Sequence, residues 1–144
     1  MNFDQLQAFA SSSPLLTTAL LGLTVAIIVT EIMRLFRGYA ALAPAQLTAL
    51  INRDNALVVD LSAIGDFEKG HIAGSRNVTP SQFDPESKLL NPAKALPVVV
   101  VCRNGAASAS AAQRLKKAGF QNVSWLDGGV AAWQQADLPL VKGR

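Results

Sequence analysis

Cysteine and histidine are scarce in this chain, where Cys102 and His71 are the sole residues of their types among 144. A single thiol excludes an internal disulfide framework, which agrees with a reducing compartment. One cysteine and one histidine do not supply a zinc site, so no metal is expected. The sequence also lacks a glycine-rich phosphate-binding signature, and we expect no cofactor.

Charged residues are also few: they make up 16% of the chain, whereas hydrophobic residues make up 50%. The formal net charge is +3, but no block of Lys and Arg with interleaved aromatic residues is present. We therefore expect no nucleic-acid binding. The length suits one ordinary domain, and the apolar excess is concentrated near the N-terminus.

No charged residue lies between Gln5 and Thr30, and residues 15–29 are almost wholly apolar. Together with the residues that follow, this segment approaches the ~20 residues that a membrane-spanning helix needs. A cleaved signal peptide requires a basic start, but the first 33 residues contain no Lys or Arg. A buried core helix would normally retain a polar stripe. A membrane anchor over residues 14–36 agrees best with the pattern.

The charges that flank the anchor predict its orientation. Asp4 alone precedes the apolar run, whereas Arg34 and Arg37 follow it closely. The positive-inside rule therefore predicts a single-pass protein of the inner (cytoplasmic) membrane, with its C-terminal domain in the cytoplasm. Glu31 is expected at the interface, beside Arg34. The expected organisation is a polar, loosely ordered lead, an anchor and a domain, over residues 1–13, 14–36 and 37–144.

Strand and helix patterns alternate through the rest of the chain. Four consecutive valines, Val98 to Val101, indicate a strand buried on both faces, as in a parallel sheet. Further strands are expected over residues 56–61, 72–78 and 122–126. Helices are expected from residue 44 and over residues 65–69, 107–118 and 129–135. This alternation predicts an α/β fold, a parallel sheet flanked by helices on both faces.

Cys102 lies between the valine strand and a helical pattern. This position is the carboxyl edge of a strand, facing a helix N-terminus, where open α/β sheets bind ligands and backbone N–H groups favour an anion. Because a thiolate is an anion, the position is expected to lower the pKa of the thiol and make Cys102 a nucleophile. The alternative is an inert buried thiol, which is common for a lone cysteine.

Several separated motifs resemble those of the rhodanese domain, from about residue 40 to residue 144. They are the strand Val58–Leu61 followed by Asp66–Ser75, the loop after Cys102, the segment Gly119–Val123, and Leu126–Gly129 followed by Trp133. The apolar span, together with the ending Leu138–Arg144, is similar to the membrane-anchored, single-domain type of rhodanese-like protein. The resemblance implies the rhodanese-like parallel sheet.

The resemblance also implies sulfur transfer, with Cys102 as the catalytic nucleophile. Its thiolate would attack the outer sulfur of a sulfane donor, and a thiol acceptor would then remove that sulfur from the resulting persulfide. The amides of a small-residue loop would hold the anion, and the only cation in that loop would assist. The loop residues are Arg103, Asn104, Gly105, Ala106, Ala107 and Ser108.

The chain departs from many rhodaneses at Ala107, where they carry a basic residue, and at Ser62, where they carry Arg. Both departures remove positive charge, so thiosulfate, a dianion, is expected to bind poorly. A weakly catalytic adaptor that binds a membrane protein partner is therefore the alternative function. Phosphatase chemistry is disfavoured, because the Cys-x5-Arg pattern would need Arg in place of Ser108 and His in place of Val101.

Two further polar residues are candidates for supporting roles. His71 is a possible general base, since its ordinary pKa is near ~6.5, but a structural role is favoured because it follows a helix-ending glycine. Asp60 is a possible site carboxylate, but we expect it to tie loops together by accepting N–H bonds. A carboxylate in contact with a thiolate would raise the pKa of the thiol, which argues against such contact.

Overall fold

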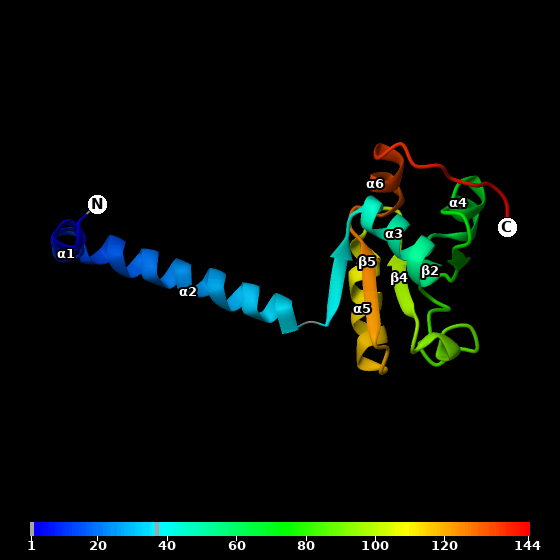
Figure 1. Ribbon diagram of the computed structural model, residues 1–144, viewed down its shortest axis with the longest axis horizontal. Helices are drawn as coiled ribbons and strands as arrows, with labels where there is room; N and C mark the ends of the chain where they lie inside the picture. The colour runs from blue at the N-terminus through cyan, green and yellow to red at the C-terminus, as the bar shows by residue number, and fades with distance from the viewer. Residues whose placement is uncertain (1, 37) are drawn as a thin grey trace. The chain divides into compact units, whose positions relative to one another are not determined.

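Residues 2–36 and 38–144 are described by the computed structural model, and they fall into two units, Met1–Arg37 and Gly38–Arg144 (Figure 1). The first unit consists of the helices α1 (Phe3–Ser12) and α2 (Pro14–Phe36). The second unit contains a five-stranded sheet with helices on both faces. The apolar helical segment and the α/β domain therefore belong to separate units.

The prediction of a loosely ordered lead over residues 1–13 is wrong, because α1 occupies most of that segment. The backbone N–H of Asn2 donates to Oε1 of Gln5 at 3.3 Å, so a side chain satisfies an amide at the start of the helix. The residues that follow include Leu, Gln and Ala, which are good helix formers. None of the residues of α1 is buried, so local capping and propensity favour this helix more than core packing does.

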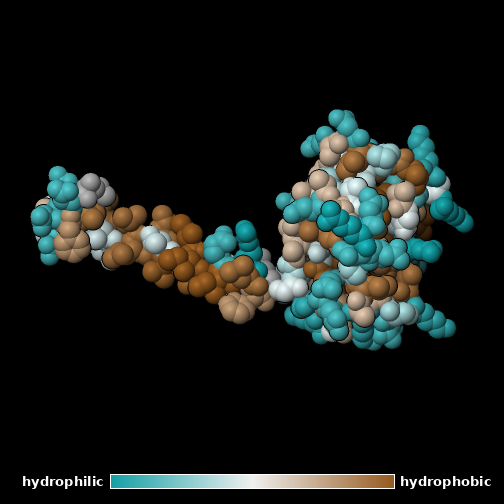
Figure 2. Space-filling model, in the orientation of Figure 1, coloured by the Kyte–Doolittle hydropathy of each residue, from teal (hydrophilic) through white to brown (hydrophobic). Residues whose placement is uncertain are grey.

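Helix α2 is long and apolar enough to cross a membrane, and none of its residues is buried within the molecule. Figure 2 shows hydrophobic side chains along its length. Its polar groups are satisfied internally: Thr24 donates to the carbonyl of Leu20 at 2.8 Å, and Thr30 to that of Ile27 at 2.8 Å. A signal sequence near an N-terminus meets the same length and composition criteria.

The second unit alternates strands and helices, as predicted. Its strands are β1 (Tyr39–Leu42), β2 (Leu57–Asp60), β3 (Arg76–Asn77), β4 (Pro97–Val101) and β5 (Asn122–Leu126). Its helices are α3 (Pro44–Asp54), α4 (Ile64–Lys69), α5 (Ala106–Lys117) and α6 (Gly129–Gln135), with a 3-10 turn over Asn91–Ala93. The strands pair in the order β1-β5-β4-β2-β3, and every pairing is parallel.

Strand β4 lies at the centre of the sheet, and its side chains alternate between two apolar layers. Val98 and Val100 pack in one layer with the buried face of α5, and Cys102 belongs to the same layer. Val99 and Val101 pack in the other layer, with buried residues of α3 and α6. Because both faces of the strand are covered, apolar side chains are favoured along its whole length.

The sheet has a topological switch point between β2 and β4. From β2 the chain continues through α4 to β3 at one edge, and from β4 it continues through α5 to β5 on the opposite side. The two connections leave neighbouring strands in opposite directions, which opens a crevice at the carboxyl ends of those strands. Cys102 is the first residue after β4 and therefore lies at this crevice.

Candidate functional site

The loop after β4 wraps its backbone around the sulfur of Cys102. Gly105 has a φ of 89°, in the left-handed region, and its N–H donates to Sγ at 2.9 Å. The side-chain oxygen of Asn104 accepts from the N–H of Ala106 at 3.1 Å, which holds the turn. Helix α5 then begins at Ala106. The sulfur is therefore enclosed by amides from a tight turn and the start of a helix, as in an anion nest.

The hydroxyl of Ser108 is a second hydrogen-bond partner of the sulfur, and whether it donates depends on the protonation state of Cys102. Its Oγ lies 3.3 Å from Sγ and 3.0 Å from the carbonyl oxygen of Gly105. A hydroxyl has one hydrogen, so it donates to only one of these acceptors at a time. When Cys102 is a thiol, the hydroxyl can donate to the carbonyl of Gly105, and the sulfur can donate to the hydroxyl or to Oδ1 of Asn104, 3.9 Å away. When Cys102 is a thiolate, the hydroxyl rotates and donates to Sγ.

The environment lowers the pKa of Cys102 below its ordinary value. Burial of the side chain, which is 5% exposed, by itself raises the pKa of the thiol. The hydroxyl of Ser108 and the amides of Ser108, Ala107 and Asn104 stabilise the thiolate and outweigh that effect. The thiolate is therefore favoured by oriented neutral dipoles, which makes Cys102 a stronger nucleophile at neutral pH.

Helix α6 holds the cysteine loop in place through backbone hydrogen bonds. The N–H of Val130 donates to the carbonyl of Cys102 at 2.9 Å, and the N–H of Ala131 donates to that of Arg103 at 3.2 Å. The approach is so close that a Cβ on Gly129 would lie 2.1 Å from the carbonyl oxygen of Cys102. Gly129 also has a φ of 63°, which other residues rarely adopt. Only glycine at this position allows α6 to satisfy the loop carbonyls.

Arg103 is directed to α4. Its Nη2 donates to the carbonyl of Asp66 at 2.8 Å and lies 3.8 Å from the carboxylate of the same residue. This hydrogen bond joins the cysteine loop to α4 and uses one of the five N–H donors of the guanidinium. Of the other loop residues, Asn104, Ala106 and Ala107 are exposed, whereas Gly105 and Ser108 are buried.

Asp60 and Ser62 lie at the end of β2, beside the cysteine loop. The carboxylate of Asp60, 1% exposed, accepts the N–H of Ser62 at 2.8 Å. Asn77 donates to the carbonyl oxygens of Asp60 and Ser62, at 3.2 and 2.8 Å. These bonds tie the β2 loop to β3. The hydroxyl of Ser62 is buried and has no hydrogen-bond partner among the described residues.

His71 holds the C-terminal tail against α4. Its ring stacks on Phe67 with centroids 3.7 Å apart, and Nδ1 donates to the carbonyl of Phe67 at 2.8 Å. Its backbone N–H and carbonyl pair with Val141 in an isolated antiparallel bridge. These contacts keep the ring buried and give it a packing role between α4 and the C-terminal tail.

The fold and the loop together define the class: a parallel α/β domain with an activated cysteine at its switch point. The family model of the rhodanese-like domain matches residues 43–136. The chain therefore belongs to the rhodanese-like domain family, as its motifs indicated.

Individual relatives and a solved structure match different shares of the chain. The uncharacterized protein YibN of Escherichia coli K12 is 39% identical over 142 residues, covering 98% of this chain and 99% of that protein. The thiosulfate sulfurtransferase GlpE of Pseudoalteromonas translucida is 30% identical over 95 residues, covering 64% of this chain and 86% of GlpE. A crystal structure of a rhodanese-related protein from Thermoplasma volcanium aligns with a TM-score of 0.64 and 26% identity, covering 73% of this chain and all of that one.

The sequence did not indicate the role of the Gly128-Gly129 pair. The motif Leu126–Gly129 resembles a family signature, but the sequence does not indicate that the helix after it donates hydrogen bonds to the carbonyls of the cysteine loop. The left-handed φ values of 75° and 63° at these positions explain why two glycines occur together.

Ser108 is predicted to set the reactivity of Cys102. In Ser108→Ala the thiolate loses its hydroxyl donor, so the pKa of Cys102 should rise and alkylation by iodoacetamide at neutral pH should slow about tenfold. The measurement is the alkylation rate as a function of pH. Ser110→Ala removes a hydroxyl from the same helix without touching Sγ and should leave the profile unchanged. An unaltered profile in Ser108→Ala would contradict the role of the hydroxyl.

Gly129→Ala is predicted to disrupt the loop as well as the fold. The left-handed backbone alone costs about 1–3 kcal/mol for a non-glycine residue, and the clash with Cys102 adds to this. We expect a lower denaturation midpoint, followed by tryptophan fluorescence, and a higher pKa of Cys102. Gly65→Ala is the control, because a Cβ there meets nothing within 4 Å. Equal effects of the two substitutions would refute the close-approach argument.

Proposed function

We propose that this protein is a membrane-anchored sulfurtransferase or persulfide carrier that uses Cys102 as its nucleophile. The observation that carries the proposal is the stabilised thiolate, which receives the amide of Gly105 at 2.9 Å and lies 3.3 Å from the hydroxyl of Ser108. An inert core thiol would have a raised pKa, whereas the pKa of Cys102 is lowered. Rhodanese-like family membership supports the same chemistry.

The reaction would proceed in two displacements at sulfur. The thiolate of Cys102 attacks the outer sulfur of the donor, an S–S bond forms, and the donor's own S–S bond breaks as its remainder leaves with the electron pair. A thiolate acceptor then attacks the outer sulfur of the persulfide and regenerates the Cys102 thiolate. The amides that hold the resting thiolate are also placed to stabilise the anionic persulfide and the returning thiolate.

Charge near the site bears on the choice of donor. GlpE relatives are named thiosulfate sulfurtransferases. In this chain Arg103 is bonded to Asp66, and neutral residues occupy positions 62 and 107. Among the described residues of the cysteine loop, a dianion would thus meet neutral dipoles and one cation, Arg103, that is already bonded to Asp66. We propose that a sulfane donor of lower charge density than thiosulfate is preferred.

Sulfur loading of Cys102 provides the direct test. Incubation of the full chain in detergent with a sulfane donor should add one sulfur atom, detected by intact-protein mass spectrometry. Cys102→Ser should add none. We expect loading by an organic persulfide to exceed loading by thiosulfate at equal concentration.

Absence of loading by every donor, together with alkylation of Cys102 no faster than that of free cysteine, would refute the enzyme proposal. That result would instead favour the adaptor function, in which the domain binds a membrane protein partner and Cys102 is incidental. Matched thermal unfolding of Cys102→Ser and the wild type serves as the folding control.

The membrane anchor is the second part of the proposal. Helix α2 has the length, the exposed apolar surface and the internally bonded Thr hydroxyls that a span requires. Arg34, which lies 3.6 Å from Glu31 near the end of the helix, supports a cytoplasmic location for the C-terminal domain.

Fractionation of bacterial cells that express the chain tests this anchor. The protein should remain in the inner membrane after alkaline carbonate extraction, and removal of residues 2–36 should release the domain. Protease added outside intact spheroplasts should leave the domain uncut. Release by carbonate, or loss of the N-terminal segment from the mature chain, would refute anchoring, and cleavage from outside would reverse the orientation.

A further inference from the structure

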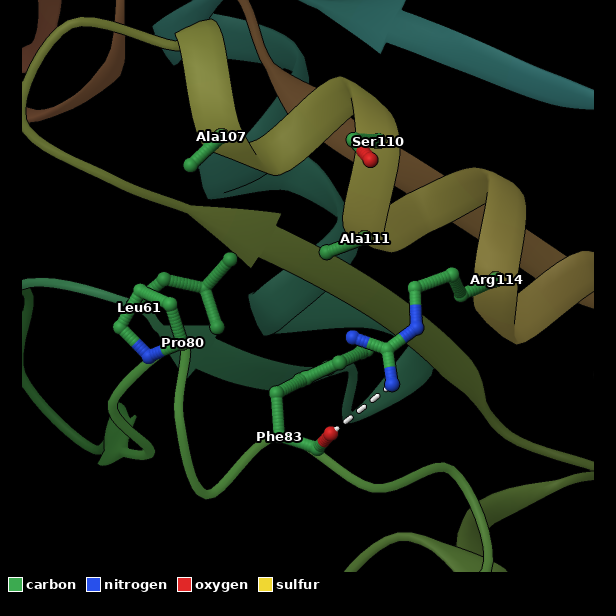
Figure 3. A pocket seen from close by; sticks show the side chains of 7 residues that line it. All are labelled: Leu61, Pro80, Phe83, Ala107, Ser110, Ala111 and Arg114. Atoms are coloured by element: carbon green, nitrogen blue, oxygen red, sulfur yellow. Dashed lines mark hydrogen bonds between the residues drawn. The ribbon is translucent and has the colours of Figure 1, made fainter.

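A pocket with a volume of about 180 Å³ lies beside the cysteine loop (Figure 3). It is formed by the end of β2, the segment between β3 and β4, and one face of α5. Its lining consists of Leu61, Pro80, Phe83, Ala107, Ser110, Ala111 and Arg114. Ala107 belongs both to the lining of the pocket and to the loop that binds the sulfur, so the pocket adjoins that loop.

The α5 side of this pocket is a single stripe. Ala107, Ser110, Ala111 and Arg114 are spaced by three and four residues, so they share one face of the helix. The stripe begins at Ala107, whose amide stabilises the thiolate of Cys102. Arg114 lies seven residues further on, about 10 Å along the axis. A ligand in the pocket would therefore have one end near the sulfur and the other near a cation.

The contacts with Phe83 fix the position of Arg114 and use one of the N–H donors of its guanidinium. Its Nη2 donates to the carbonyl of Phe83 at 3.1 Å, and its guanidinium carbon lies 4.9 Å from the centre of the Phe83 ring. A guanidinium has five N–H donors, so most remain for a ligand. Arg114 takes part in none of the ion pairs found among residues 2–36 and 38–144. A carboxylate on a ligand would thus meet a preoriented cation.

We propose that this pocket binds the organic part of a carboxylated peptide thiol, delivered to Cys102 as its persulfide, and that Arg114 determines specificity by binding the carboxylate. The inference rests on the proposed sulfur transfer and names its donor class. The organic part of a peptide thiol is long enough to extend from the loop toward Arg114, about 10 Å along α5. Thiosulfate is too short to reach from the loop to Arg114. The apolar walls formed by Leu61, Phe83 and Ala111 suit the aliphatic part of such a donor.

The transfer step balances without a further reactant. The thiolate of Cys102 attacks the terminal sulfur of the donor R–S–SH and forms a new S–S bond. The S–S bond of the donor breaks, and R–S⁻ leaves with the electron pair, while the proton stays on the transferred sulfur. Arg114 does not touch the reacting atoms and acts on the binding of the organic group.

Kinetics with two persulfides test the proposal on the full chain in detergent. The probes are glutathione persulfide, which carries two carboxylates, and the persulfide of 2-mercaptoethanol, which carries none. Arg114→Met should raise KM for glutathione persulfide about tenfold and leave kcat unchanged, because it removes one charge-assisted contact. Its KM for the neutral probe should not change. Arg114→Lys should restore part of the affinity, and Lys117→Met, on the same helix outside the pocket, should behave as the wild type.

The outcomes separate this proposal from the function on which it rests. Loading of Cys102 by both probes with no dependence on Arg114 would overturn the carboxylate site and leave sulfur transfer intact. An equal rise of KM for both probes would assign Arg114 a role in holding Phe83 and would also overturn the carboxylate site. Failure of all donors to load Cys102 would refute sulfur transfer and this proposal together. Thermal unfolding of each variant reports whether the contact with Phe83 matters for stability.

Discussion

The hydrogen bonds from α6 to the carbonyls of Cys102 and Arg103 are the constraint on which the site depends. A loop that turns its amides toward a sulfur must turn carbonyls away from it, and buried carbonyls need donors. The first turn of α6 has N–H groups without partners inside the helix, and it supplies them. Gly129 allows the necessary approach. The anion-binding face and the helix-bound face are thus two sides of one backbone segment.

The thiolate is stabilised by neutral dipoles alone among the contacts described for it. The amides of the loop and the hydroxyl of Ser108 face the sulfur, whereas the guanidinium of Arg103 bonds to α4. Salt screens charged groups at the surface strongly but affects short, buried dipole contacts little. The reactivity of Cys102 should therefore depend on loop geometry more than on ionic strength. Ser62, in place of a charged residue, leaves a buried hydroxyl in the adjoining loop.

Much of this architecture could be predicted because it follows from local patterns. The valine run determines β4, and the small-residue helical pattern that follows it determines α5, so Cys102 is found at the expected edge of the sheet. The predicted bounds of β5 and α6 match the structure. The pairing of Arg103 with Asp66 and the docking of Gly129 on the loop join distant segments, and no periodicity reports such contacts. The helix α1 was missed because its stability depends on capping and propensity, which hydrophobic patterning does not report.

The burial of Cys102 has a consequence for when the site is accessible. The resting side chain is 5% exposed, so bulky oxidants and unrelated thiols reach it slowly. In the proposed persulfide, the transferable sulfur would lie about 2 Å beyond Sγ, farther from the buried position of that atom. The persulfide form would then present its outer sulfur to an acceptor, whereas the thiolate form keeps Sγ of Cys102 buried. The accessibility of the transferable sulfur would depend on whether Cys102 carries it, and no segment of the domain would need to open.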